Sequence, residues 1–201
     1  LYCGYFDRRK PDGTMSFGIK NVKELVQKLK HENETLLDPN APLAGWGLDP
    51  IYFDDKAVDR KILDVVSDQR PIGILHASGH KLNINSVGLK LAGFLRTGIN
   101  HEGLPLGDDG LPSGEIRGAE TIALVTRHVG LGKDWLSGDA EGLRNFGKIC
   151  ARAGVTTAAD LANLQTDEAV EMMLKVTSEA DFPARILSLI HISEPTRRTD
   201  I

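Results

Sequence analysis

The chain has 201 residues, a formal net charge of −4 at pH 7 and two cysteines. This length predicts one domain or one large fragment, and the charge gives no electrostatic footprint for nucleic-acid binding. No apolar run approaches the roughly 20 residues that span a bilayer. Two distant cysteines argue against a disulfide framework and for a reducing compartment. We therefore expect a cytoplasmic globular protein that binds neither nucleic acid nor a membrane.

The first part of the chain predicts two helices separated by loops. Residues 1–17 are loop-like and include a Pro-Asp-Gly turn. Apolar residues then recur at helical spacing over 21–31. A second helix is expected over 57–66. The adjacent Asp54 and Asp55 are interpreted as its cap rather than as metal ligands, because neighbouring carboxylates point apart on most backbones.

A short strand is expected at Leu43–Leu48, between these helices. Gly45 and Gly47 flank Trp46, and such glycine gaps allow another group to approach the backbone on both sides of the aromatic residue. Trp46 is either part of the core or the wall of a pocket.

The stretch from Arg70 to Leu89 is the centre of the predicted organisation. Its apolar run at residues 72–76 predicts a buried strand, and Gly79 permits a turn. Asn85 and the serine after it are suited to capping a helix that continues through Leu91. Two histidines, a serine and two asparagines thus stand where a strand ends and a helix begins, a common place for chemistry in α/β proteins.

The remaining elements alternate between helix and strand, after a long loop over 97–118 that is rich in Gly, Pro and Asp. Capping and stop signals predict helices, and β-branched or apolar runs predict strands. The helices are expected at 120–129, 137–154 and 166–176, and the strands at 155–161 and 182–190. This alternation predicts an α/β fold with a parallel sheet and crossover helices. The tail at 188–201 does not continue the pattern and is interpreted as non-native.

Two histidines four residues apart, His76 and His80, raise the question of a metal site. On a helix this spacing shares one face, but along a strand it separates the residues by about 13 Å. Convergence on one ion would need a sharp turn at Ser78 and Gly79. No nearby Cys or Glu completes a ligand set, so we assign no metal ligand. His80 is the better pocket candidate, as a donor to a substrate carbonyl or as a proton shuttle near neutral pH.

A serine hydrolase is a weaker hypothesis from the same stretch. Ser78 would be the nucleophile, His80 the base, and Asp49 or Asp160 the third member. The surrounding Ala-Ser-Gly-His lacks the Gly-x-Ser-x-Gly elbow, and a serine beside a glycine is more often a turn residue.

An ordered set of motifs gives the chain a family resemblance. The motifs are Gly45-Trp-Gly-Leu-Asp49, Arg70-Pro71 leading to His76-Ala-Ser-Gly-His80, Asn85-Ser86 with Leu89 and Ala92-Gly93, Leu111-Pro-Ser-Gly-Glu115, and Gly154-Val-Thr-Thr157. From about residue 20 to 187 the chain resembles amidohydrolase family 3, which includes N-substituted formamide deformylases. The resemblance implies a metal-dependent hydrolase of amide-like, non-peptide C–N bonds on a (β/α)8 TIM-type barrel, with a zinc-type ion that activates water.

The family's metal ligands do not occur in this sequence. The resemblance implies a His-x-His on the first barrel strand, a lysine, two later histidines and an aspartate, and the chain has no His-x-His. We therefore expect an internal fragment at 1–187: a partial barrel, incomplete at both ends, with inserted helices and a long loop. It would contribute His76, Ser78, His80 and Trp46 to the wall of a pocket for a small amide-like substrate. It would supply no catalytic residue and bind no metal itself, whereas the full-length parent would hold a divalent metal, with zinc favoured.

The alternative is a non-catalytic α/β module whose loops bind a small ligand or a partner. Neither hypothesis fixes the oligomeric state.

Overall fold

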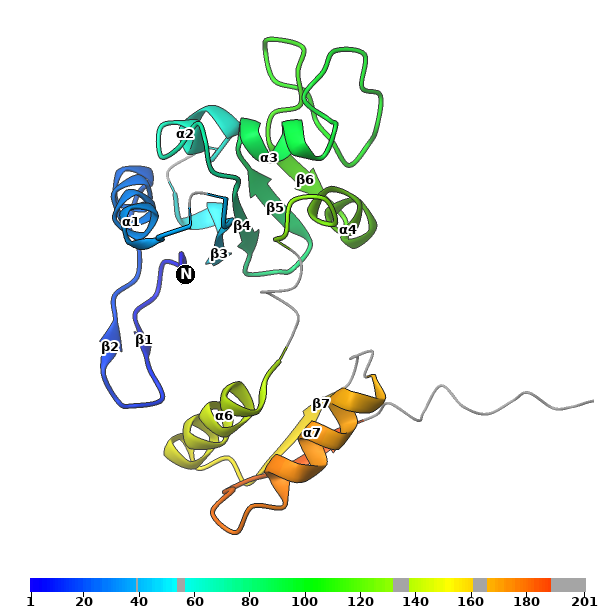
Figure 1. The fold of residues 1–201 in the computed structure, drawn as a ribbon. Coiled ribbons are helices and arrows are strands. Elements are labelled where there is room, and N and C mark those ends of the chain that lie inside the picture. The colour runs from blue at the N-terminus through cyan, green and yellow to red at the C-terminus, as the bar shows by residue number, and fades with distance from the viewer. Residues whose placement is uncertain (39, 54–56, 132–137, 161–165, 189–201) are drawn as a thin grey trace, which may run out of the picture. The chain divides into compact units, whose positions relative to one another are not determined.

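A computed structural model describes residues 1–38, 40–53, 57–131, 138–160 and 166–188 (Figure 1). The chain divides into two compact units. The first comprises residues 1–8 and 15–136, and the second comprises residues 9–14 and 137–201. Within the described ranges, no helix combines the length and apolar character needed to cross a bilayer.

The described elements confirm the mixed α/β class. In chain order they are β1 (Arg8–Arg9), β2 (Met15–Ser16), α1 (Val22–Thr35), β3 (Leu43–Leu48), the 3-10 helix η1 (Pro50–Tyr52), α2 (Arg60–Asp64), β4 (Ile72–His76), β5 (Lys81–Ile84), α3 (Ser86–Leu91), β6 (Glu115–Arg117), α4 (Ala119–Thr126), α6 (Ala140–Ala153), β7 (Thr157–Asp160), α7 (Asp167–Thr177) and β8 (Arg185–Ser188).

The central sheet of the first unit has the order β3-β4-β5-β6. Strands β3 and β4 are parallel, with α2 in the crossover between them, and Tyr2 forms a further parallel bridge with Trp46 of β3. The expected parallel arrangement with crossover helices is therefore present at this side. Strands β5 and β6, by contrast, pair antiparallel with their neighbours. The partial barrel stays a prediction.

Strand β5 is the main departure from the expected elements. The sequence predicted one strand, a turn and then a helix between Arg70 and Leu91. Instead the turn after His76 is so tight that the chain returns directly as β5, next to β4. This hairpin explains why the sheet is mixed, because a strand that returns through a short turn can pair only antiparallel.

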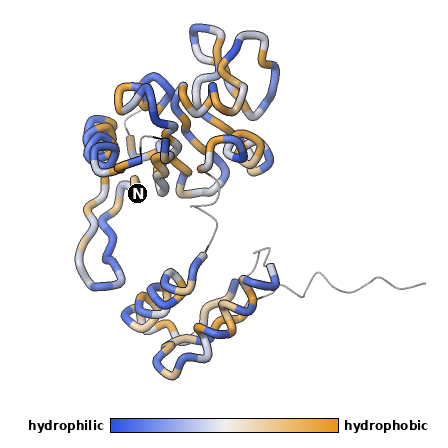
Figure 2. Tube along the Cα trace, in the orientation of Figure 1, coloured by the Kyte–Doolittle hydropathy of each residue, from blue (hydrophilic) through white to orange (hydrophobic). Residues whose placement is uncertain are grey.

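The two faces of this sheet pack against different helices. Ile72 and Ile74 of β4 belong to a core cluster with Leu25 and Leu29 of α1. On the other face, Leu82, Ile84 and Ile116 pack with residues that include Leu89 of α3 and Val125 of α4. Figure 1 shows the sheet between α1 and α4, and Figure 2 shows hydrophilic and hydrophobic residues alternating around α1, as an amphipathic helix requires.

The glycines beside Trp46 accommodate the first residues of the chain, which confirms the expected close approach. A Cβ atom at Gly45 would lie 2.9 Å from the Sγ atom of Cys3, and one at Gly47 would lie 2.8 Å from the ring of Tyr2. Gly47 also has a φ of +91°, which L side chains rarely adopt. The register of β3 against β4 shifts at this glycine, so that Leu48 rather than Gly47 lies opposite His76.

Helix caps predicted from local residue types are largely confirmed. The side chains of Asn85 and Thr166 accept backbone N–H groups at the starts of α3 and α7. Gly154 ends α6 in a left-handed conformation with φ 70°. The cap expected at Asp54 and Asp55 lies outside the described residues. The residue that caps α2 is Asp59, whose carboxylate accepts the N–H of Ile62 at 2.9 Å, because the helix begins later than expected.

The long loop after α3 is fixed to α2 by a buried arginine. The Arg60 guanidinium donates to Pro112 O at 3.0 Å and to Ser86 Oγ at 3.1 Å, and it pairs with Asp109. Contacts from Lys61, the backbone N–H of Leu111 and Arg60 together lower the pKa of Asp109 to about 2. The length of this loop indicated either function or disorder, and the observed contacts make it an ordered part of the first unit.

The second unit is a small β-α-β arrangement that follows α6. Strands β7 and β8 pair in parallel, with α7 in the connection. Gly147 of α6 lets Phe182 and Pro183 pack close, since a Cβ atom there would lie 3.0 Å from the Phe182 ring. The Arg144 guanidinium binds the Glu179 carboxylate through two nitrogens, at 2.9 and 2.6 Å. The tail at 188–201 falls almost wholly outside the described residues, so its proposed boundary stays a prediction.

The Cys3 thiol is expected to resist alkylation in the native protein. Burial is the largest influence and raises the pKa of Cys3 to about 11, and the residue has no exposed surface. Because the thiolate is the reactive form, we expect labelling by iodoacetamide at mildly alkaline pH only after unfolding. Peptide mapping with and without urea measures this, and rapid native labelling of Cys3 would contradict the packing beside Gly45.

Candidate functional site

The β4–β5 hairpin brings the polar residues of the central stretch to one end of the sheet. Its turn begins with the Gly79 N–H donating to His76 O at 3.0 Å, and Gly79 has φ +72°. The sharp bend that the sequence argument required for convergence of the two histidines is therefore present. Yet His76 is buried within the strand, whereas His80 is exposed in the turn.

His76 is held by a hydrogen-bonded chain that crosses two strands. Its Nε2 atom pairs with Asn83 Oδ1, and Asn83 Nδ2 donates to Val58 O at 2.5 Å. Both His76 and Asn83 are nearly inaccessible, at 5% and 3% exposure. Asn83 lies opposite Ile74 in the register of β4 and β5, so it shares with His76 the face that α1 and α2 cover.

Charged side chains complete this end of the sheet. Glu115 of β6 lies opposite Asn83, and its carboxylate binds Arg117 Nε at 2.5 Å and Lys81 Nζ at 3.5 Å. Burial alone would raise the pKa of Glu115, but the Arg117 hydrogen bond and the charge of Lys81 outweigh it, so the pKa lies below its usual value. The result is a neutral histidine beside an ionised, paired carboxylate.

Burial also lowers the pKa of His76 below its ordinary value of 6.5. The hydrogen bond with Asn83 and the charges of Glu115 and Asp49 oppose this effect, while Lys81 reinforces it. The neutral imidazole is therefore the native form at pH 7. Such a group can accept a hydrogen bond or a proton, which are the tasks of a ligand-binding or general-base histidine.

This shift predicts a pH dependence of stability. Below pH 6.5 the unfolded chain binds a proton at His76 more readily than the folded chain, so the contribution of the neutral histidine is present above pH 6.5 and is lost as pH falls through the folded pKa. We expect the unfolding free energy of His76→Gln to fall less than that of the wild type between about pH 7.5 and pH 5.5. Urea titrations at several pH values measure it. An unchanged slope would show that His76 titrates normally.

Ser78 and His80 do not form a catalytic pair through their side chains. The Ser78 hydroxyl accepts the backbone N–H of His80 at 3.3 Å, which is the role of a turn residue. Asp49 caps η1, with its carboxylate accepting Ile51 N–H at 3.3 Å, and Asp160 belongs to the second unit. The serine hydrolase hypothesis therefore gains no support from the geometry of the hairpin.

Trp46 lies on the opposite face of the sheet from His76. It pairs in register with Leu75, which alternates with His76 along β4. Its ring is 42% exposed, so Trp46 is not a core residue. The ring contacts Tyr2, with centroids 5.2 Å apart, and the Arg8 guanidinium lies 4.7 Å from its centroid. The structure thus brings His76 to the hairpin turn of Ser78 and His80 but separates Trp46 from them.

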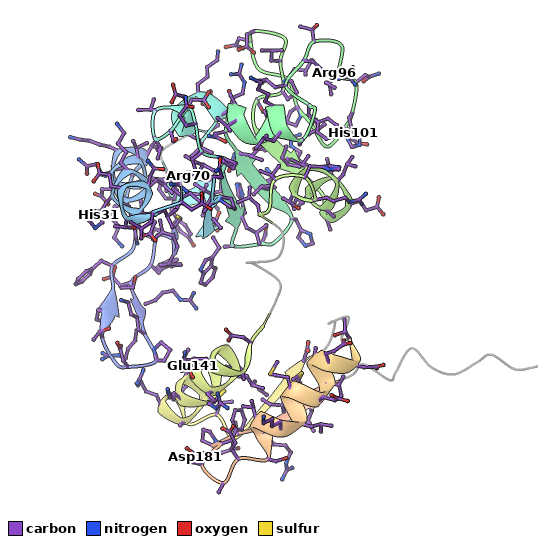
Figure 3. The ribbon with its side chains drawn as sticks, viewed as in Figure 1. His31, Arg70, Arg96, His101, Glu141 and Asp181 are labelled. Carbon is purple, nitrogen blue, oxygen red and sulfur yellow. The ribbon has the colours of Figure 1, made fainter. Side chains whose placement is uncertain are left out.

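Within the described residues, no cluster of side chains fits the metal that the resemblance implies. No group of three or more His, Cys, Asp or Glu side chains in the described part of the chain is placed to hold an ion. Figure 3 shows His31 and His101 at the periphery of the first unit, and both are exposed. They have no partner pattern in the sequence that would indicate a ligand set.

Two asparagines near this site were not assigned their actual roles from the sequence. Asn83 received no role, although the alternation of Lys81, Leu82, Asn83 and Ile84 is a strand signal that would have placed it beside His76. Asn85 was expected only to cap a helix. Its side chain also bonds Ile72 N, Ser67 O and Arg70 O, at 3.0, 3.1 and 2.9 Å.

Comparison with known proteins gives limited information. No family model matches the chain, and no curated protein matches it. The chain is similar to two solved structures at 15% identity, over 85% of its own length. One is an uncharacterized metal-dependent hydrolase from Pyrococcus horikoshii OT3, with a TM-score of 0.49 and 31% of that chain covered. The other is an uncharacterized metal-dependent hydrolase from Pyrococcus furiosus, with a TM-score of 0.47 and 32% covered. The chain thus spans about a third of each, and the likeness is too loose to assign the fold.

Proposed function

We propose that this chain is an internal part of a metal-dependent amidohydrolase that cleaves amide-like, non-peptide C–N bonds. In this proposal the divalent metal, with zinc favoured, is held by residues outside the chain, and it activates water for the full-length protein. The chain contributes part of the pocket wall through His76, Ser78 and His80. Trp46 is left out of this wall because it lies on the other face of the sheet.

One observation carries the proposal: motifs that are far apart in the sequence are bonded to one another around the β4–β5 hairpin. Ala77 N donates to Leu48 O at 2.8 Å, and Asn85 Nδ2 donates to Arg70 O at 2.9 Å. Arg60 links the motif at Leu111–Glu115 to that at Asn85-Ser86, because its guanidinium donates to Pro112 O at 3.0 Å and to Ser86 Oγ at 3.1 Å. Four of the motifs behind the family resemblance therefore form one structural cluster, as expected if they were retained together for one site.

The cluster offers chemistry that suits a neutral amide ligand. His76 holds an uncharged, nearly buried imidazole at the end of β4, and the exposed turn that follows carries Ser78 and His80. These groups can donate to a carbonyl oxygen and accept from an N–H group. In the proposal they bind and orient the substrate, and no step of hydrolysis is assigned to them.

Hydrolysis assays on two proteins test the proposal. With zinc and an N-substituted formamide, the chain alone should release no amine above a zinc control. The longer product of the same gene should release it, and His76→Gln there should lower kcat/KM about tenfold, the effect of losing one substrate hydrogen bond. Turnover by the chain alone, or a longer product without turnover, would contradict the proposal.

The alternative is a non-catalytic binding module, and the contact of the exposed Trp46 ring with the half-buried Tyr2 ring favours it. Tyr2 and Trp46 present rings under the Arg8 guanidinium, 5.1 and 4.7 Å from their centroids. Such a surface suits a small ligand or a partner that stacks on aromatic rings. If this alternative holds, the longer gene product remains inactive, and Trp46→Ala abolishes binding while His76→Gln does not.

A further inference from the structure

We propose that Asn83 is a positioning residue that fixes the His76 ring with Nε2 protonated and leaves Nδ1 as the acceptor for an N–H group of a small ligand. The inference rests on the proposed function, because it names the ligand chemistry of the same site. It assigns a role to a residue that neither the motifs nor the family resemblance includes.

The orientation of the Asn83 amide follows from its second partner. The backbone carbonyl of Val58 can only accept a hydrogen bond, so the atom of Asn83 that lies 2.5 Å away must be the NH2 nitrogen. The amide oxygen then faces the histidine ring. Since this oxygen can only accept, the Nε2 atom of His76 must carry a hydrogen and donate it.

The opposite nitrogen of the ring is left with its lone pair. A neutral imidazole has one protonated nitrogen, so Nδ1 is an acceptor when Nε2 donates. No residue that the structure describes hydrogen-bonds to Nδ1. His76 as a residue keeps 5% of its surface exposed.

The surroundings of the ring favour an uncharged donor over a cation. Glu115 is already bound to Arg117 and Lys81, so it offers little attraction to a second positive group. Burial keeps the imidazole neutral and makes protonation by an acidic ligand costly. The ligand class that fits is a small molecule with a neutral N–H, such as a secondary amide, rather than an amine or an acid.

Histidine-specific nitrogen NMR on the chain provides the test. Long-range correlation spectra at about pH 7.5 distinguish protonated from unprotonated ring nitrogens, and His76→Gln assigns the signal. N-methylformamide and N,N-dimethylformamide form a matched pair of probes, because they share the carbonyl and differ in the N–H. We expect a protonated Nε2, and an Nδ1 signal that shifts and saturates with N-methylformamide only.

Variants of Asn83 separate positioning from structural support. Asn83→Leu should give a mixture of tautomers and lose the selective response of Nδ1. Asn83→Asp keeps an acceptor for Nε2, so it should retain the tautomer and the response and raise the pKa of His76. If the leucine variant does not fold, the wild-type spectrum and the aspartate variant still decide the matter.

Three results would overturn the inference: an unprotonated Nε2 in the wild type, an equal Nδ1 response to both formamides, or an unchanged tautomer and response in folded Asn83→Leu. Failure here is distinguishable from failure of the proposed function. If the longer gene product hydrolyses formamides but Nδ1 shows no selective response, only this inference is wrong. If Nδ1 responds selectively but that product hydrolyses no formamide, this inference is supported and only the proposed function is wrong.

Discussion

Asn85→Ala is expected to reduce the unfolding free energy of the first unit by about 3–5 kcal/mol. The Asn85 side chain has no exposed surface, and it satisfies four backbone groups. Its Oδ1 atom accepts the N–H groups of Ile72 and Gly88, and its Nδ2 atom donates to the carbonyl groups of Ser67 and Arg70. An unpaired buried polar group costs about 1–3 kcal/mol, so removing this residue cancels much of a stability of about 5–15 kcal/mol.

Urea titration followed by amide resonances of the first unit measures this effect. Asn100→Ala is the matched control, because Asn100 is exposed and lies outside the described helices and strands. We expect the control to change the unfolding free energy by less than about 0.5 kcal/mol. Similar values for the two variants would show that Asn85 is an ordinary helix cap.

Arg70→Met is expected to cost about 2–4 kcal/mol and to release the segment that follows α1. The Arg70 guanidinium lies between α1 and the central sheet, as Figure 3 shows, and it is only 5% exposed. It donates to Asn33 Oδ1 at 2.8 Å, to the carbonyl groups of Asp38 and Leu36 at 2.7 and 3.1 Å, and to that of Ala41. Methionine keeps the apolar stem but offers no donor.

Two further variants sharpen this experiment. Arg96→Met is the matched control, since Arg96 is an exposed arginine. Arg70→Lys should recover only part of the loss, because one ammonium group cannot reach four acceptors in the fixed fork of a guanidinium. Unfolding free energies and hydrogen exchange near Ala41 are the measurements. Full recovery by lysine would mean that charge alone, rather than geometry, stabilises this segment.

The elements that sequence analysis predicted correctly are those specified by local chemistry. Asn85, Thr166 and Gly154 mark helix ends through the side chain or backbone freedom that one residue supplies, so no knowledge of distant contacts is needed. The strand at Leu43–Leu48 was predicted with its observed bounds because glycine and proline punctuate it.

Other features that were missed depend on partners far away in the chain, unlike β5, whose alternation is a local signal. Strand β6 has three residues and exists because Ile116 pairs with Leu82, 34 positions earlier. Arg60 could not be distinguished from a surface arginine, since its acceptor at Pro112 lies 52 positions away. The position of His76 at the end of an apolar run made it a site candidate, but its contact with Asn83 depends on the pairing of β4 with β5, which sequence analysis did not predict.

The shift in register between β3 and β4 at Gly47 limits which substitutions this position can accept in evolution. The shift adds one position to β3, which moves Leu48 onto the side of the sheet where it is fully buried and sets Asp49 within electrostatic reach of His76. A residue at position 47 that cannot adopt a positive φ would favour a regular strand, with position 47 opposite His76 and Leu48 turned to the other face of the sheet. The residue type at this position is therefore constrained by the register of the strand as well as by the space beside Tyr2.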